Sequence, residues 1–337
     1  MRNRISRIRT ASALVAVGAG IGVLAGLSSG ASAAPLNSVT GALPRIHAMP
    51  TIHDARIPLS STGDCVLPIG VSVTCVGNGA PMTYGGGAID SAPGVYIVFW
   101  GWNGSDPSGQ AAYQQRFFQG AGGSPWNASQ TQYCNATDAV GLTCTPGATH
   151  VGNPSGLLKG TWTDNTNAVP ANPTDAAIQA EAARAAANFG NTTAASNANT
   201  QYIIDTPHGN STTGFATQWC AYHGNAPSSY GGLAYTDFPY ITDAGTSCGQ
   251  NFVNAGSAGL LDGVSIVGGH EFAETETDVS PPSGWTDTAG AETGDKCAWI
   301  QTGPGASADV TLSSGTFAVQ SLWSNAANAG AGGCVLG

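Results

Sequence analysis

The chain has 337 residues, of which 10 are Lys or Arg and 20 are Asp or Glu, so its formal net charge is −10. This charge argues against nucleic acid and anionic membrane surfaces as partners, because both are negatively charged themselves. The length is enough for one large domain with a sizeable core or for two small ones.

Residues 1–33 have the pattern of an export signal. Four arginines precede an apolar run over 11–27, and Ala31-Ser32-Ala33 supplies a small-residue cleavage site. The run is rich in glycine and shorter than the roughly 20 apolar residues that span a bilayer, so we expect cleavage and no retained membrane anchor. The sequence therefore predicts a secreted, extracellular protein, which we expect to be a monomer.

All eight cysteines follow this segment. An even number of cysteines behind an export signal indicates disulfides formed in an oxidising compartment. No two of them form a C-x-x-C motif, so metal ligation by thiolates is not expected. We favour pairing between sequence neighbours: Cys65–Cys75, Cys134–Cys144, Cys220–Cys248 and Cys297–Cys334.

Two parts follow the signal. Residues 34–85 are rich in Pro, Gly, Ser and Thr, lack sustained periodicity and contain His47 and His53. This composition favours an extended N-terminal arm or a propeptide. Residues 86–337 are expected to form a single domain.

Local patterns place several elements in that domain. Residues 95–100 are continuously apolar and predict a buried central strand, and 202–204 predict a second one. Helices are expected over 110–119 and over 175–189, the latter with Thr174 as its N-cap.

The remaining segments are less regular. Residues 210–260 are dominated by Gly, Ser, Tyr and Asn and are expected to form long loops with short strands, whereas 317–323 alternate like a half-buried strand. Together the elements predict an α+β, zincin-like fold, in which a central mixed sheet packs on helices and carries long loops and disulfides.

Four of the five glutamates fall within residues 271–292. Asp262 is expected to cap a helix from 263 to about 277. On this helix His270 and Glu274 are four residues apart and project from one face, which allows both to bind one metal ion. Glu276 turns to another face and is expected to be solvated.

A catalytic zinc ion usually has three protein ligands, so a third is needed from another segment. We predict Glu292 as this ligand, with Asp295 as a supporting residue or a substitute and Asp278 as a further alternative. Two carboxylate ligands would neutralise a divalent ion and make it a weaker Lewis acid.

The helix also provides a base. Glu271, next to His270, is predicted to deprotonate the water bound to the metal. His223 is a candidate for stabilising the substrate oxyanion, and Tyr240 is a weaker one. These residues predict a secreted zinc-dependent hydrolase, most readily a metallopeptidase that acts on a peptide or protein substrate.

Two other functions stay open. An excess of oxygen ligands favours a harder cation, so the chain could be a non-catalytic extracellular or cell-wall-associated protein with a structural Ca²⁺. A glycosidase that uses Glu271 and Glu292 is the other alternative, although it leaves the shared face of His270 and Glu274 unexplained. Solvated glutamates on an exposed helix would require no function at all.

The chain also resembles the phosphate-induced protein or EXORDIUM-like family of secreted plant and bacterial proteins. The resemblance covers roughly residues 80–337, and the His270–Glu274 block is its most specific part. Departures include Val279 after Thr277-Asp278, where the family often has proline, and Thr286 after Trp285. The shared segments are 84–87, 95–101, 220–223, 262–265, 270–274 and 322–325, with Asp278, Trp285, Glu292, Asp295 and Cys297.

The resemblance implies an extracellular, cell-wall-associated protein but no settled reaction. It therefore supports secretion and the importance of the His270–Glu274 block, while the peptidase prediction depends on the residues themselves.

Overall fold

The computed structural model describes residues 46–53, 65–66, 72–73 and 79–337. The predicted signal over 1–33, most of the predicted arm and Cys75 of the predicted Cys65–Cys75 pair lie outside the described residues. Within the described ranges, no helix combines the length and the apolar character needed to cross a membrane.

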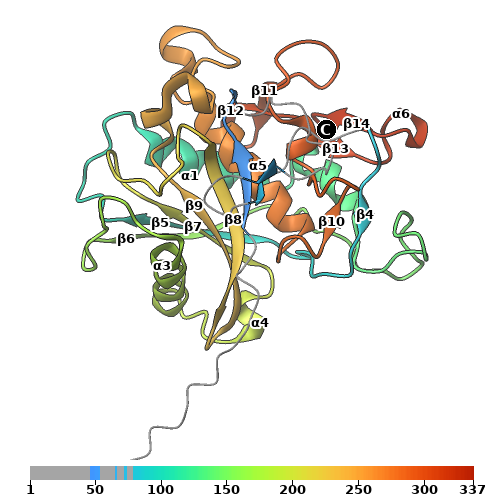
Figure 1. Cartoon of the computed structure of the whole chain (residues 1–337), viewed down its shortest axis with the longest axis horizontal. Helices are drawn as coiled ribbons and strands as arrows, with labels where there is room; N and C mark the ends of the chain where they lie inside the picture. The colour runs from blue at the N-terminus through green and yellow to red at the C-terminus, as the bar shows by residue number, and fades with distance from the viewer. Residues whose placement is uncertain (1–45, 54–64, 67–71, 74–78) are drawn as a thin grey trace, which may run out of the picture. The chain divides into compact units, whose positions relative to one another are not determined.

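A mixed β-sheet forms the centre of the fold (Figure 1). Two short pieces extend its edge beyond β1. In spatial order the strands are β6 (Leu158–Asp164), β5 (Gly94–Trp100), β7 (Thr200–Asp205), β9 (Gly231–Phe238), β8 (Trp219–Ser228), β1 (His47–Pro50), β3 (Ser72–Val73) and β2 (Cys65–Val66).

Strand direction divides this sheet. Strands β6, β5, β7 and β9 run parallel, whereas β8 is antiparallel to β9. Strand β1 then pairs antiparallel with the outer edge of β8, which aligns His47 with His223 and Ala48 with Tyr222. A segment from the predicted arm therefore belongs to the sheet of the domain.

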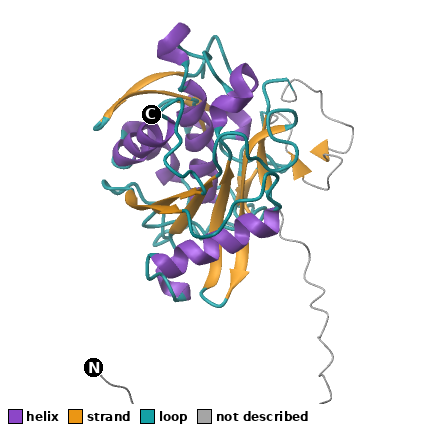
Figure 2. Cartoon of the chain, turned by 90° about the vertical axis from the view of Figure 1, so that its left-hand side faces the viewer, coloured by secondary structure: helices purple, strands orange, loops and turns teal. Residues whose placement is uncertain are grey.

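The two faces of the sheet pack on different helices (Figure 2). Alternate residues of β5 point to opposite sides, as the twofold period of a strand requires. Val95, Ile97 and Phe99 join a core with α1 (Gln110–Ala121) and α5 (Asp262–Thr277). Val98 and Trp100 join a second core with α3 (Asp175–Asn188). This arrangement confirms an α+β fold with a mixed sheet packed on helices.

Helix boundaries follow the local signals closely. Thr174 caps α3 as predicted, because its hydroxyl oxygen accepts a hydrogen bond from the backbone amide of Ala177 at 3.3 Å. Helix α5 ends at Thr277 as expected, but Asp262 is its first residue and no side chain caps it. The Asp262 carboxylate instead accepts hydrogen bonds from the backbone amides of Val253 and Asn254, at 2.9 and 2.6 Å.

Two predictions for irregular segments are wrong. Residues 210–260 contain the ten-residue strand β8 and the eight-residue strand β9, not only short strands, because a hairpin at 229–230 pairs 222–228 with 231–237. The single strand predicted over 317–323 is two strands, β12 (Gly315–Val319) and β13 (Leu322–Ser324), in separate small sheets.

Short elements complete the described chain. They are β4 (Thr83–Tyr84), α2 (Pro125–Ala128), η2 (Ser129–Gln132), α4 (Ala194–Asn197), η3 (Ile241–Cys248), η4 (Gly256–Gly259), β10 (Trp285–Thr286), η5 (Asp295–Cys297), β11 (Ala308–Leu312), α6 (Ala327–Gly330) and β14 (Gly333–Val335).

Three predicted disulfides are present: Cys134–Cys144, Cys220–Cys248 and Cys297–Cys334. Disulfides of this kind indicate an oxidising compartment. The last of them joins the loop after β10 to β14, and so braces the segment that contains Glu292 and Asp295.

Candidate metal centre

Helix α5 is buried on every side. All 16 of its residues are buried, so the picture of a solvated acidic face does not apply. The expectation for Glu276 is therefore wrong. Its side chain is fully buried between α5 and α2, and Oε1 accepts a hydrogen bond from Asn127 at 3.1 Å.

His270 and Glu274 meet as their spacing predicts. One helical turn apart on α5, they bring Nε2 of His270 to 3.1 Å from Oε1 of Glu274. Both side chains are fully buried. The other ring nitrogen of His270, Nδ1, lies 3.2 Å from the amide oxygen of Gln320.

The segment after β10 delivers the distant carboxylates. The backbone amide of Asp295 donates to Oε1 of Glu274 at 2.9 Å, and the amide of Glu292 donates to Oδ2 of Asp295, also at 2.9 Å. Gly294 makes this approach possible, because a Cβ atom there would lie 2.7 Å from Nδ1 of His270. The loop therefore sits directly against the helix.

Strand β8 supplies His223 from the opposite side. Its Nδ1 lies 2.9 Å from Oε2 of Glu271, and its Nε2 lies 3.3 Å from Oε2 of Glu292. All three residues are at most 1% exposed. The predicted base and the predicted oxyanion residue are thus direct neighbours.

Strand β1 adds a residue that the sequence did not single out. Nε2 of His47 lies 2.5 Å from Oδ2 of Asp295, although the two residues are 248 positions apart. His47 Nδ1 lies 3.9 Å from Oε1 of Glu292. The sequence offered no signal for this contact, because His47 stands in a segment without periodicity.

Three sets of potential ligands result, and Glu274 belongs to all of them. Within each set, the ligand atoms lie within 4.8 Å of one another. Asp295 joins His270 and Glu274 in one set, whereas Glu292 joins Glu274 in another. Asp278 belongs to none of the sets found among the described residues. The sets are His270–Glu274–Asp295, His47–Glu274–Glu292 and His223–Glu271–Glu274.

The protonation states reflect this crowding. Burial opposes charge on His270, but the carboxylate of Glu274 beside it raises the pKa of His270 to about 9. Burial likewise works against ionisation of Glu274, yet His270 and the other histidines lower its pKa to about 2. For Glu292 burial prevails and holds its pKa well above the usual range. Positive charge is therefore strongly favoured among these carboxylates.

Unpaired ligand atoms indicate that a cation fits here. Buried polar atoms normally have a hydrogen-bond partner. Zinc ligands arranged tetrahedrally at about 2.0–2.1 Å from the ion lie about 3.3 Å from one another, which resembles the His270–Glu274 separation of 3.1 Å. Among the residues that the structure describes, the cluster atoms that make no well-aligned hydrogen bond are Nε2 of His223 and His270, Oε2 of Glu274, both carboxylate oxygens of Glu292, and Oδ1 of Asp295.

Gln320 supports the cluster from behind. Its Oε1 lies 3.2 Å from Nδ1 of His270, and its Nε2 donates to the carbonyl of Gly294 at 2.8 Å. With Nδ1 of His270 donating to Gln320, Nε2 would be the nitrogen available to a metal. Gln320 was also missed, because a glutamine in an alternating segment carries no signal for this role.

Tyr240, the weaker candidate for stabilising the oxyanion, lies outside the cluster. The hydroxyl of Tyr240 donates to Asp106 at 2.7 Å and also contacts Ser108, neither of which belongs to the cluster.

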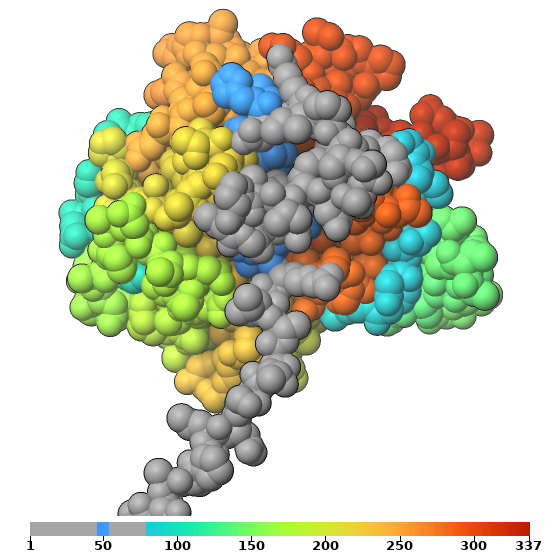
Figure 3. All heavy atoms as spheres, in the orientation of Figure 1, coloured from blue at the N-terminus to red at the C-terminus, as the bar shows by residue number. Residues whose placement is uncertain are grey.

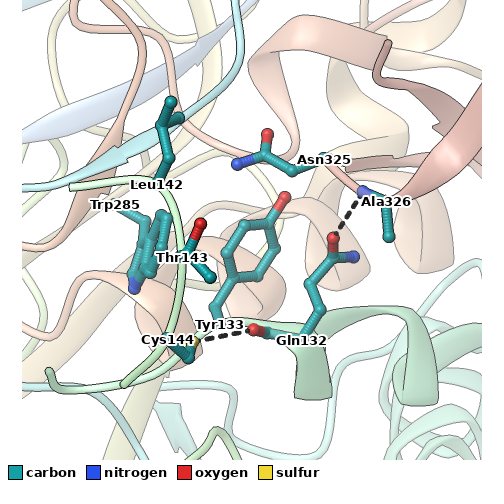
Figure 4. A pocket seen from close by; sticks show the side chains of 8 residues that line it. All are labelled: Gln132, Tyr133, Leu142, Thr143, Cys144, Trp285, Asn325 and Ala326. Carbon is teal, nitrogen blue, oxygen red and sulfur yellow. Dashed lines mark hydrogen bonds between the residues drawn. The ribbon is translucent and has the colours of Figure 1, made fainter. Parts of the chain in front are cut away.

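A separate pocket of about 330 Å³ has the rings of Tyr133 and Trp285 in its wall, with centroids 5.0 Å apart (Figure 4). None of the clustered histidines or carboxylates lines this pocket. The cluster around α5 is therefore separate from this pocket.

Comparison with known proteins gives no assignment: no family model, no curated protein and no solved structure matches the chain. The resemblance to the EXORDIUM-like family stays a prediction. Function must be inferred from the cluster itself.

Proposed function

We propose that the chain is a secreted zinc-dependent hydrolase of zincin-like architecture, most readily a metallopeptidase. The observation that carries this proposal is the convergence of three histidines and four carboxylates in one buried cluster. Its members are His47, His223, His270, Glu271, Glu274, Glu292 and Asp295. A buried histidine and carboxylate set with unpaired ligand atoms matches the chemistry of a zinc site.

The residues of the cluster would have separate roles as metal ligands and as a general base. His270 and Glu274 would hold the metal together with Asp295 or Glu292, since each of these carboxylates joins Glu274 in a ligand set. A bound zinc ion supplies a Lewis acid that polarises a carbonyl and makes water easier to deprotonate. Glu271 would take the proton from that water and pass it to the leaving amine.

His223 supports Glu271 in this scheme. Its Nδ1 contact with Oε2 of Glu271 fixes the direction of the carboxylate, at 2.9 Å. Burial opposes a positive charge on the ring, but the carboxylates of Glu271 and then Glu274 prevail and raise the pKa of His223. A protonated His223 would stabilise negative charge on the substrate oxygen.

The test combines metal analysis with one isosteric pair of variants. Mass spectrometry of the purified protein should find zinc, and Glu271→Gln should keep that zinc while losing at least a hundredfold in hydrolysis of a peptide library, as expected for removal of a general base. Glu276→Gln is the matched control, because Glu276 is buried on the same helix but contacts Asn127. A zinc-loaded Glu271→Gln variant with full activity would refute the mechanism.

A structural calcium site is the second candidate. It is favoured by the complete burial of Glu274, Glu292 and Asp295 and by the excess of oxygen over nitrogen in the cluster. Calcium instead of zinc in the purified protein, with no chelator-sensitive hydrolysis, would support this function.

A further inference from the structure

Strand β1 is attached to the domain as an added strand of the sheet. It pairs antiparallel with residues 219–223 of β8, and the pairing continues beyond the strand, where Thr51 donates its amide to the carbonyl of Gln218 at 3.1 Å. The amide of Ile52 donates to Ser247 at 3.0 Å. Proteins that bind extended peptides by adding a strand to a sheet edge use this kind of contact.

The edge of β8 exists without β1. On its other side β8 pairs with β9 from Tyr222 to Ser228, and the Cys220–Cys248 disulfide anchors the part of β8 before Tyr222 to η3. Strand β1 itself has only four residues, and its register shifts between Met49 and Pro50. A proline also lacks the amide that would continue the ladder.

The peptide bond between Ala48 and Met49 lies at the proposed base. The amide of Met49 donates to Oε1 of Glu271 at 3.2 Å. In peptide hydrolysis the base delivers its proton to the nitrogen of the bond that is cleaved. Strand β1 therefore presents a peptide nitrogen to Glu271 in the way that a substrate would.

His47 reaches the metal ligands from the same strand. It forms a ligand set with Glu274 and Glu292, in addition to its contact with Asp295. A catalytic zinc site keeps one position open, and an additional imidazole from the chain would fill it.

The segment closes the site physically. All four residues of β1 are buried, and Met49 belongs to the hydrophobic core. Trp299 holds the far end by donating its indole N–H to the carbonyl of Pro50 at 2.8 Å. In Figure 3 the blue atoms of residues 46–53 lie between yellow atoms of the β8–β9 part of the chain and orange atoms from further along.

We propose that residues 46–53 act as a tethered, substrate-like inhibitor, in which β1 occupies the place of an extended peptide substrate along β8 and His47 blocks the metal. This inference rests on the proposed function. It names the ligand of this edge of β8 as a peptide in extended conformation, and it requires the segment to leave before a substrate can bind.

Two single variants of the full chain test the inference. His47→Ala removes the blocking imidazole, and Met49→Pro removes the backbone N–H that donates a hydrogen bond to Glu271. Each should raise kcat/KM on a peptide library at least tenfold over the unaltered chain, with unchanged zinc content and intact disulfides. Hydrogen exchange at the amides of residues 219–223 should become faster in Met49→Pro. His150→Ala, which removes an exposed histidine outside residues 46–53, should change neither quantity.

Loss of zinc and of activity in His47→Ala would overturn the inference, because His47 would then be a working ligand. In that case the proposed function still stands if the activity of the unaltered chain is lost in Glu271→Gln. If no variant hydrolyses peptides, the proposed function fails. A fluorescent peptide with the sequence of residues 46–53 then tests whether β1 occupies a peptide-binding edge of β8. Binding to Met49→Pro but not to the unaltered chain supports occupation by β1. No binding, together with unchanged exchange, refutes it.

Discussion

The backbone amide of Asp295 donates a hydrogen bond to Oε1 of Glu274 at 2.9 Å, across a separation of 21 residues. Through this contact the loop after β10 is fixed to the helix that carries the predicted ligands. The neighbouring residue, Gly294, has helical backbone angles that any residue can adopt. Glycine is therefore needed at this position only because a side chain would have no room there.

Gly294→Ala should therefore weaken metal binding. The new methyl group would lie 2.7 Å from Nδ1 of His270 and 2.9 Å from Oε1 of Glu274, so the loop must move away from both ligands. Supporting contacts of metal ligands typically contribute about 10- to 100-fold to affinity, and we expect a loss of that size. Competition with a chromophoric chelator measures it. An unchanged affinity would show that the loop does not position the ligands.

The two glycines before His270 should respond differently to alanine. A methyl group at Gly268 would lie 3.6 Å from Phe238, an ordinary contact, whereas one at Gly269 would lie 3.0 Å from Trp126 and 3.2 Å from Phe117. Alanine favours a helix interior over glycine by about 1 kcal/mol. Gly268→Ala should thus raise the free energy of unfolding by about this amount.

Gly269→Ala should lower the stability instead, because the Trp126 ring must shift, and overpacking of a core costs about 1–3 kcal/mol. Denaturant unfolding of both variants gives the comparison. Equal effects would mean that close aromatic packing is not the reason for Gly269. Gly268→Ala also serves as the control for Gly294→Ala, since it adds the same methyl group near His270 without touching a ligand.

Elements defined by short-range patterns were predictable from the sequence. The apolar run over 95–100, the cap at Thr174 and the four-residue spacing of His270 and Glu274 each depend on neighbours along the chain. Such signals can be read without knowledge of tertiary contacts, because each depends on residues that are close along the chain.

The long-range parts of the site could not be predicted in this way. His47 enters through a strand addition, and Gln320 through one hydrogen bond, so neither leaves a periodic pattern. Strand β8 was missed because its Gly, Asn and Pro residues disfavour strands, and the pairing with β9 and β1 overrides that preference.

Gln320→Ala should weaken metal binding without removing a ligand. The change deletes the acceptor for Nδ1 of His270 and the donor to the carbonyl of Gly294, so both the tautomer and the loop lose support. We expect about a 10- to 100-fold loss of zinc affinity. Gln320→Glu, which keeps an acceptor for His270, should lose less.

Gln114→Ala provides the matched control for this pair. Gln114 is also a buried glutamine, but its Nε2 donates to Asp205 at 3.3 Å and not to the cluster. Zinc affinity should be unchanged in this variant, even if its stability falls. Equal losses of affinity in Gln114→Ala and Gln320→Ala would point to general destabilisation and against a specific role for Gln320.

Asp237 should make the stability of the protein depend on pH. The residue lies fully buried on β9, and burial raises its pKa from 3.8 to about 7. Between these values the folded state holds a proton that the unfolded state has released. Its contribution to stability is therefore fully present below pH 3.8 and is lost as the pH rises through about 7.

Asp237→Asn removes this titration while keeping the shape of the side chain. At pH 4 the variant and the unaltered chain should have similar stability, whereas at pH 8 the variant should be more stable by up to roughly 4 kcal/mol, at about 1.4 kcal/mol per pKa unit. Urea unfolding at both pH values measures the difference. Asp309→Asn, at an exposed position, should show no such trend. A variant that gains no stability relative to the unaltered chain between pH 4 and 8 would show that Asp237 is ionised in the folded protein throughout this range.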